Sequence, residues 1–402
     1  MKNQERISVK LSKFHTSLTL SLKALVDERR ASGLPVYDFG LGETKGELAP
    51  YIREAGRQAF DEGQTMYSDP AGLPELRAEV LKWLGIEEEY PADSVVITAG
   101  AKQALFNVFL AICNPADAVL LDAAPWVSYQ PLATAAYGFP VMVIPARGDA
   151  NRLKCDPADL KRNLRMRPHA KIFVLNNPVN PTAQLYSLPE IEELLHICVE
   201  HEVFFVLDRL YWRIIFDGAA YPSPIVNPDT RRWLIQIDGM SKNFRRTGGI
   251  RIGWSVAPGD VARAMVNLQS HYTAGPARPA QCAALAAIRH SYEPGLPGEL
   301  QDKRDLLHKE AEGMPWVKIW PSPATFYSFW DVRSTFGKKT PKGERIEGST
   351  DLSEYLIKEG GVITASGAAF MQEGYLRLSF ATEVETIRDG MAAMRRGLEA
   401  LV

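Results

Sequence analysis

Short apolar runs alternate with amphipathic helical segments between about residues 95 and 258, and this alternation restricts the possible folds most strongly. Continuous apolar runs separated by helices are typical of strands that are covered on both faces. The helices then act as crossovers, so the pattern predicts a mostly parallel sheet in an α/β fold. The predicted strands are residues 95–98, 118–121, 141–144, 171–175 and 203–207 with two more runs flanking Lys242, and the predicted helices include residues 102–113 and 188–202.

Length and composition exclude several classes of protein. A chain of 402 residues is long enough for two or three structural units with a cleft between them. Its 46 basic and 48 acidic residues leave a formal net charge of −2, which implies neither a nucleic-acid partner nor an anionic membrane surface. No apolar run approaches the roughly 18 residues that a membrane helix needs. The first residues also lack the apolar core of a signal peptide.

The cysteines bear on the compartment and on metal binding. Cys113, Cys155, Cys198 and Cys282 are scattered, without C-x-x-C pairs or neighbouring histidines. This spacing predicts neither a metal site nor a disulfide framework, and it fits a reducing compartment. We therefore expect a cytoplasmic protein without a metal, a membrane partner or a nucleic-acid partner.

Ligands of parallel sheets bind beyond the carboxyl ends of the strands, so the residues that follow the predicted strands are candidates for a site. Gly100, Ala101 and Lys102 open a helix whose free N–H groups suit an anion such as phosphate, although ordinary capping also explains small residues there. Trp126 offers a flat ring for stacking, or is a core residue. Asn180 lies between two Asn-Pro pairs, which predict a rigid loop that presents its amide or a turn without a ligand.

Charged residues near strand ends complete the candidate set. Asp208 follows five apolar residues and needs a partner, which a protonated pyridine nitrogen or Arg209 could provide. Arg251 and Arg377 lie in alternating apolar sequence, where a buried guanidinium suits a bidentate carboxylate or a structural salt bridge. Lys242 follows the apolar run 233–237, where a desolvated amine could form a Schiff base with a carbonyl, although a surface lysine is the commoner case.

The motifs around these residues occur in a characteristic order. They are Tyr67…Gly72, Gly100-Ala101-Lys102-Gln103-Ala104-Leu105, Pro125-Trp126-Val127-Ser128-Tyr129, Asn177-Pro178-Val179-Asn180-Pro181-Thr182, Asp208-Arg209-Leu210-Tyr211, Ser241-Lys242 and Tyr375-Leu376-Arg377-Leu378-Ser379. From about residue 20 to the C-terminus, the chain resembles the class I/II aminotransferases of the pyridoxal-phosphate (PLP) fold-type-I superfamily. Within that family it is most similar to the aspartate-aminotransferase-like subgroup.

The resemblance implies a fold, a domain division and an assembly. The fold is α/β, PLP fold type I, with a mostly parallel seven-stranded sheet between helices in a large domain and a smaller α+β domain from both chain ends. The implied boundaries are 1–60 for an N-terminal arm and part of the small domain, 61–290 for the large PLP-binding domain and 291–402 for the C-terminal small domain. The assembly is a homodimer with active sites between the domains.

The resemblance also assigns roles to individual residues, with pyridoxal 5'-phosphate as the cofactor. Lys242 would be the Schiff-base lysine and proton shuttle, Asp208 would keep the pyridine nitrogen protonated, and Tyr211 would bind the ring's O3′. The residues assigned to the cofactor are Gly100, Ala101, Lys102, Trp126, Asn180, Asp208, Tyr211, Ser241, Lys242, Arg251 and, reaching the partner subunit's phosphate, Tyr67. The residues assigned to the substrate are Arg377, Gly42, Trp126 and Asn180, and no metal is assigned.

Several residues depart from the family pattern near the phosphate and the substrate. Gly239 stands where a serine or threonine usually binds the phosphate, and one extra residue precedes Arg251. Arg278 is added near the place where a partner subunit's loop approaches the substrate. Leu110 stands on the active-site helix, where related dicarboxylate enzymes present a polar or basic residue. On this ground we expect neither aspartate nor glutamate as the preferred donor, unless Arg278 restores that preference.

These observations predict a PLP-dependent aminotransferase that acts on an α-amino acid through a Lys242 Schiff base. The alternative is a PLP-dependent lyase, cyclase or synthase, because the same carbanion can also undergo elimination, cyclisation or replacement. A regulator with an appended DNA-binding domain fits poorly, because the resemblance begins near residue 20 and leaves no room for a helix-turn-helix domain.

Overall fold

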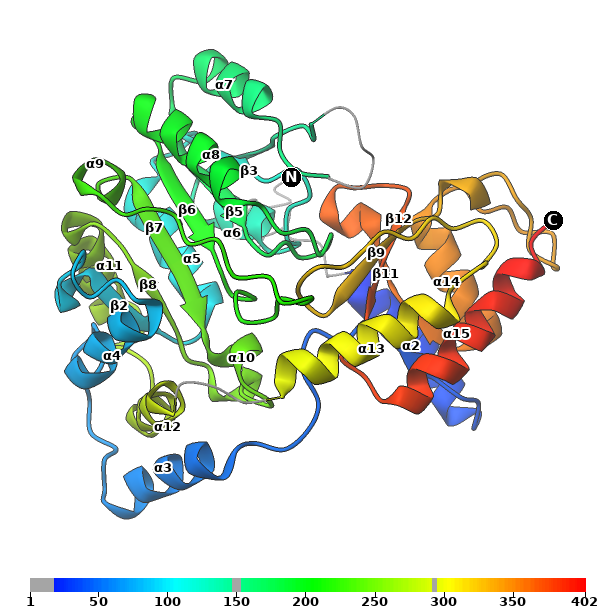
Figure 1. Ribbon diagram of the computed structural model, residues 1–402, viewed down its shortest axis with the longest axis horizontal. Helices are drawn as coiled ribbons and strands as arrows, with labels where there is room; N and C mark the ends of the chain where they lie inside the picture. Colours follow the sequence, from blue (N-terminus) through cyan, green and yellow to red (C-terminus); the bar gives the residue numbers. More distant parts are fainter. Residues whose placement is uncertain (1–17, 147–152, 291–294) are drawn as a thin grey trace, which may run out of the picture.

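A seven-stranded sheet with helices on both faces forms the larger part of the molecule (Figure 1). The computed structural model describes residues 18–146, 153–290 and 295–402, with side chains from residue 25 onwards. The strand order is β2-β8-β7-β6-β5-β3-β4. The strands are β2 (Val95–Thr98), β3 (Ala118–Leu121), β4 (Phe139–Met142), β5 (Ala170–Asn176), β6 (Phe204–Asp208), β7 (Leu234–Gly239) and β8 (Gly253–Val256). The predicted irregular arm before residue 18 lies outside the described residues.

The sheet is mostly parallel, which confirms the prediction from the alternating pattern. Strands β3 to β7 pair in parallel with their neighbours, whereas β8 runs antiparallel to both β7 and β2. The observed bounds of β2 and β3 equal the predicted ones. Strand β4 begins two residues before the predicted run, at Phe139, which is 62% exposed. No residue of β4 is fully buried, whereas every residue of β2, the other edge strand, is buried. Strand β4 therefore lacks the fully buried apolar run that reveals the other strands.

Alternate residues of the central strands pack into two separate cores. Phe173 and Leu175 of β5 pack with α7 (Pro157–Met166) and α8 (Leu188–Glu200) on one face. Ile172 and Val174 of the same strand pack with helices on the other face, among them α5 (Ala101–Ile112) and α11 (Gly259–Tyr272). Burial on both faces explains why these strands appear in the sequence as unbroken apolar runs.

Two smaller sheets lie beside the large one. Strands β11 (Ala365–Ser366), β12 (Tyr375–Ser379) and β9 (Tyr327–Asp331) form an antiparallel sheet in that order. Strand β1 (Tyr37–Asp38) pairs in parallel with β10 (Val362–Ile363), so segments from both ends of the chain meet here. The helices α2 (Leu18–Ala31) and α15 (Val384–Glu399), the first and last that the structure describes, also lie in this part of the molecule (Figure 1).

The remaining helices connect and cover these sheets. They are α2 (Leu18–Ala31), α3 (Pro50–Asp61), α4 (Pro74–Leu84), α6 (Tyr129–Ala135), α9 (Pro228–Arg231), α10 (Met240–Asn243), α12 (Arg278–Arg289), α13 (Leu296–Glu310), α14 (Ser349–Gly360) and α15 (Val384–Glu399). Within the described ranges, no helix combines the length and the apolar character needed to span a membrane.

Candidate active site

Side chains at the carboxyl edge of the large sheet line a cavity of about 560 Å³. The segment after β1 and the small antiparallel sheet close its other sides. The predicted site residues that line it are Gly42, Ala101, Lys102, Trp126, Asn180, Asp208, Tyr211, Ser241, Lys242, Arg251 and Arg377. Gly100 borders the cavity beside the Arg251 guanidinium. Tyr67 does not line it and is 91% exposed.

Lys242 lies on the short helix α10, which begins directly after β7. Burial lowers the pKa of Lys242 to about 8, and among the neighbouring charges Glu43 raises this pKa while Arg377 lowers it. The side-chain nitrogen donates a hydrogen bond to the backbone oxygen of Gly42. An amine with this pKa is partly neutral at neutral pH, and the neutral form is the nucleophile that a Schiff base requires.

Asp208 ends β6 and lies on the cavity wall. Tyr129 donates a hydrogen bond to its Oδ2 atom over 2.6 Å, and the backbone nitrogen of Leu210 donates to Oδ1 over 3.2 Å. Burial raises the pKa of Asp208 to about 6, while the Tyr129 hydrogen bond lowers it. The alternative partner, Arg209, lies elsewhere: it donates to Gln236 Oε1 over 2.7 Å. Asp208 therefore remains available to a basic group in the cavity.

The start of α5 forms a cradle for an anion. Gly100 has a φ of 88° and precedes the helix, and a Cβ there would overlap the Arg251 guanidinium. A Cβ at Gly253 would overlap the backbone nitrogen of Ala101, so only glycine lets β8 approach the helix start this closely. The N–H groups of the first turn and the guanidinium thus converge on one place.

Two departures from the family pattern have structural explanations in this cradle. A Cβ at Gly239 would lie 2.8 Å from the Cα atom of Gly253, so a serine or threonine cannot occupy this position without moving β8. The extra residue before Arg251 is absorbed by a short 3₁₀ turn over Gly248–Ile250. Arg251 itself adopts a left-handed conformation, with a φ of 61°, and still lines the cavity.

Arg377 projects from β12 into the opposite side of the cavity. Its Nη1 atom donates to Asn180 Oδ1 over 2.9 Å, and its guanidinium lies 4.2 Å from the ring centroid of Tyr327. The buried Nε atom has no hydrogen-bond partner, and no ion pair joins Arg377 to an acidic residue of the described chain. A buried cation with spare donors suits a carboxylate ligand, rather than the structural salt bridge that was the alternative.

Aromatic and amide groups lie between these two charged ends. Asn180 Nδ2 donates to the Tyr211 hydroxyl over 3.4 Å, and that hydroxyl lies 3.2 Å from the hydroxyl of Tyr327. Trp126 packs edge-on against Tyr129 at 5.4 Å between ring centroids. The Lys102 nitrogen lies 5.1 Å from the Trp126 centroid, so Lys102 contributes a side-chain cation as well as a backbone amide.

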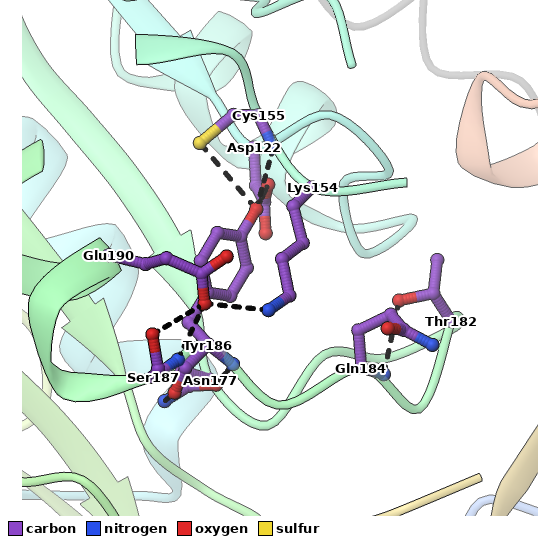
Figure 2. Close-up of polar contacts among 9 residues, drawn as sticks. All are labelled: Asp122, Lys154, Cys155, Asn177, Thr182, Gln184, Tyr186, Ser187 and Glu190. Carbon is purple, nitrogen blue, oxygen red and sulfur yellow. Dashed lines mark hydrogen bonds and ion pairs between the residues drawn. The ribbon is translucent and has the colours of Figure 1, made fainter. Parts of the chain in front are cut away.

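Figure 2 shows the polar contacts around Tyr186, which lies at the end of the loop that follows β5. Tyr186, at the end of this loop, donates to Asp122 Oδ1 over 2.8 Å and accepts a hydrogen bond from the backbone nitrogen of Cys155 over 2.7 Å. Asp122 directly follows β3 and begins the segment that leads to Trp126. One buried hydroxyl therefore connects the segments that carry Trp126 and Asn180.

Sequence reasoning missed three residues that shape this site. Tyr129 was part of a recognised motif, and its place three residues after Trp126 was the available signal. Glu43 directly follows Gly42, but nothing in the sequence indicates that its carboxylate faces Lys242. Tyr327 lies on β9, far along the chain, and carries no signal at all. Leu110, by contrast, does not line the cavity, whereas Leu105 of the same helix does.

The residues present fit pyridoxal phosphate. The helix start at Gly100, together with the Arg251 guanidinium, is suited to bind the phosphate. The Lys242 amine is suited to form a Schiff base with the aldehyde, and the Asp208 carboxylate is suited to pair with a protonated ring nitrogen. The charged residues that line the cavity are the cations Lys102, Lys242, Arg251 and Arg377 and the carboxylates Glu43 and Asp208. In the described part of the chain, no group of His, Cys, Asp and Glu side chains is arranged to hold a metal ion.

Comparisons with known proteins agree with this geometry. The sequence profile described as aminotransferase class I and II matches residues 35–394. A probable aspartate/prephenate aminotransferase from Aquifex aeolicus is 30% identical over 98% of this chain and 99% of that protein. The crystal structure of the Rhizobium meliloti aspartate aminotransferase superposes with a TM-score of 0.90 at 25% identity, covering 99% of this chain and 100% of that one. The Thermus thermophilus aspartate aminotransferase with maleate gives a TM-score of 0.87 at 28% identity, with 99% and 100% coverage.

Proposed function

The chain belongs to the class I and II aminotransferases, and from this premise we propose the role of each site residue and the class of substrate. The protein is a pyridoxal-phosphate-dependent aminotransferase. Its relatives favour amino-group transfer over the elimination, cyclisation or replacement alternative. The observation that carries the proposal is that Lys242, Asp208 and Arg377 line one cavity.

The cofactor would be held at five places. Lys242 binds it covalently, and Asp208 holds a proton on its ring nitrogen. Tyr211 and Asn180 donate to its ring oxygen, and Trp126 stacks on its ring. Its phosphate is bound by the amides of Gly100, Ala101 and Lys102, by Ser241 and Arg251, and by Tyr67 of a partner subunit. The support for this set is that all of these residues except Tyr67 line or border the cavity.

The reaction follows from these positions. The bound cofactor supplies an electron sink for the negative charge that develops at the substrate's α-carbon. The Lys242 amine would accept the proton from that carbon and would later donate it back as the acid. Its depressed pKa near 8 suits a group that must both accept and release a proton near neutral pH. Asp208 keeps the ring nitrogen positively charged throughout.

The substrate's α-carboxylate is bound by Arg377, with Asn180, Trp126 and Gly42 beside it. Replacing Arg377 with methionine is expected to lower kcat/KM roughly 100-fold, mainly through KM, because a charge-assisted pair to the carboxylate is lost. The visible band of the lysine-bound cofactor should persist in the resting enzyme, since Arg377 does not contact the cofactor in this assignment. An equal loss of activity with an amine that lacks a carboxylate would contradict the assignment.

The substrate's side chain is acidic in this proposal. After Lys242, Arg251 and Arg377 have been assigned, Lys102 is the remaining side-chain cation among the described residues that line the cavity. Its position over Trp126 suits a second carboxylate. The relatives named as aspartate aminotransferases, and the maleate in one of them, support this choice. Leu110, whose apolar side chain was the reason to expect no preference for aspartate or glutamate, does not line the cavity.

A panel of amino acids, mixed with the enzyme in the absence of a keto acid, tests both the reaction and the substrate. Aspartate or glutamate is expected to react fastest and to release one keto acid per site before the reaction stops. Lys102→Met is the matched control, because it should lose the preference for acidic side chains while still reacting with alanine. Continuous turnover without an acceptor would reject amino-group transfer. Faster reaction with arginine or lysine would assign side-chain selection to Glu43 instead of Lys102.

The proposed assembly is a homodimer in which Tyr67 reaches the partner's site. Three large side chains near residue 67 are exposed: Tyr67 (91%), Met66 (77%) and Phe60 (65%). Exposed apolar residues gathered in this way are typical of an interface.

The proposed domain division stays at about residues 60 and 290, because every strand of the large sheet falls between them.

A cytoplasmic location is supported by the four free cysteines, which suit a reducing compartment.

A further inference from the structure

Two buried residues of opposite charge, Arg209 and Asp238, lie near the carboxyl ends of the neighbouring strands β6 and β7. Arg209 directly follows Asp208 and is 1% exposed, and Asp238 lies near the end of β7 and is 0% exposed. The two strands are neighbours in the sheet. A buried charge is strongly destabilising unless other groups compensate it, so the contacts of both residues need an explanation.

The Asp238 carboxylate is surrounded by N–H donors. The backbone nitrogen of Gly239 donates to Oδ1 over 2.7 Å, and Asn243 Nδ2 donates to the same atom over 3.0 Å. Trp212 Nε1 donates to Oδ2 over 2.8 Å. Asn243 is the residue after Lys242, and Trp212 is the residue after Tyr211. One carboxylate therefore holds the chain neighbours of two residues that face the cofactor.

Arg209 supplies the compensating charge. Its guanidinium lies 4.6 Å from the ring centroid of Trp212 and 4.8 Å from that of Tyr221, so it packs against two aromatic rings that also contact each other edge-on. Burial raises the pKa of Asp238 to about 7, and the charge of Arg209 is the largest influence that lowers it. The cation thus favours the ionised carboxylate that the three donors require.

We propose that Asp238 and Arg209 are positioning residues that together set Lys242 and Tyr211 at their places around the cofactor. This inference rests on the roles proposed above for Lys242 and Tyr211. Asp238 connects α10 to the segment after β6, and Arg209 keeps that connection charged. Neither residue lines the cavity, so both act through their neighbours.

The chemistry of the carboxylate explains why a neutral residue of the same shape should not replace it. Asparagine at position 238 has one oxygen and one NH₂ group, so the NH₂ group must face at least one of the three N–H donors. That contact would displace either Trp212 and Tyr211 or Asn243 and Lys242. The Arg209 charge would also lose its buried compensation. Arg209→Met has the opposite defect, because it leaves the carboxylate without a cation.

The test compares Asp238→Asn, Arg209→Met and the double variant in the full-length protein. The readouts are the dissociation constant for pyridoxal phosphate, the visible band of the lysine-bound cofactor, kcat and KM. Each single variant is expected to bind the cofactor about 10-fold or more weakly and to shift the band, with substrate KM within about 2-fold. The double variant should bind the cofactor no more weakly than the weaker-binding of the two single variants, because it contains neither buried charge. Losses that multiply in the double variant would overturn the pairing.

Two further variants keep the inference testable if Asp238→Asn does not fold. Trp212→Phe keeps a ring over Arg209 but removes one donor, and it should shift the visible band without an equal loss of stability. Trp254→Phe is the control, because the Trp254 ring is fully buried and packs against Trp83. Trp254 lies opposite Asp238 on the neighbouring strand, but its indole N–H donates no hydrogen bond to the carboxylate. It should lower the melting temperature and leave the cofactor unchanged. An equal band shift in Trp254→Phe would show a general packing effect and overturn the inference.

The outcome also separates this inference from the proposed function. Borohydride reduction of the wild-type protein should attach the cofactor to Lys242. If the cofactor is attached elsewhere, the proposed function fails. If it is attached to Lys242 and both single variants bind and absorb as the wild type does, the proposed function stands and the positioning role of Asp238 and Arg209 fails.

Discussion

Lys242→Ala is expected to lower kcat by at least about five orders of magnitude, because it removes both the covalent attachment and the proton shuttle. The cofactor should still bind, although more weakly, since the Gly100 cradle, Arg251 and Asp208 are unchanged. Its visible spectrum should then be that of the free aldehyde. The fold should be retained, because Lys242 is only half-buried and its one hydrogen bond goes to the backbone of Gly42.

Lys102→Ala is the matched control for this variant. Lys102 lines the same cavity, and burial also lowers its pKa, with Arg251 as a second cause. After borohydride reduction and peptide mapping, the cofactor should be found on Lys242 in the Lys102→Ala protein and on no lysine in the Lys242→Ala protein. Labelling of Lys102 in the Lys242→Ala protein, or loss of the label from the Lys102→Ala protein, would contradict the assignment.

The pKa of Lys242 gives this prediction a pH dependence. With a pKa of about 8, roughly one amine in ten is neutral at pH 7, compared with far fewer for an ordinary lysine. Because only the neutral amine attacks the aldehyde, the rate at which the cofactor-free protein captures pyridoxal phosphate should rise with pH and level off above about 8. A rate that continues to rise toward pH 10 would indicate an ordinary, exposed lysine.

The sequence predicted the central part of the fold because burial on both faces leaves a direct signal. Strands β2, β3, β5, β6 and β7 appear as apolar runs, and the site residues that follow them meet in one cavity. The edge strand β4 was misplaced by two residues because its exposed Phe139 breaks that signal. The pairing of β1 with β10 has no local signal, since each strand is two residues long.

The direction of individual side chains was harder to predict than their place on the chain. Arg209 was a reasonable partner for Asp208 from its position alone, yet it turns toward Gln236 and the aromatic rings of Trp212 and Tyr221. Leu110 was placed correctly on α5, but the helix presents Leu105 to the cavity instead. Such choices depend on three-dimensional packing against other elements, which a sequence pattern does not contain.

Asp208→Asn is expected to lower kcat at least about 1,000-fold and to weaken cofactor binding, while the protein remains folded. An amide cannot compensate a positive charge on the ring nitrogen, so the cofactor becomes a poorer electron sink. The amide oxygen can accept the hydrogen bond from the Leu210 N–H while the NH₂ group donates to the Tyr129 hydroxyl, which preserves the local structure. Turnover, the cofactor's dissociation constant and the visible spectrum together measure this loss.

Tyr129→Phe separates the effect of the Asp208 charge from the effect of the hydrogen bond that Tyr129 donates to it. Burial raises the pKa of Asp208 to about 6 and the Tyr129 hydrogen bond opposes this, so removing the hydroxyl should raise that pKa further. A carboxylic acid with a raised pKa loses its negative charge as the pH falls through that pKa. In the cofactor-free variant, the affinity for the cofactor should therefore begin to fall at a higher pH than in the wild type. At pH 8 the carboxylate remains ionised and Tyr129→Phe should lose about 10-fold or less in turnover. If Asp208→Asn keeps near-normal turnover at pH 8, Asp208 does not hold the ring nitrogen, and its burial beside Tyr129 serves the fold alone.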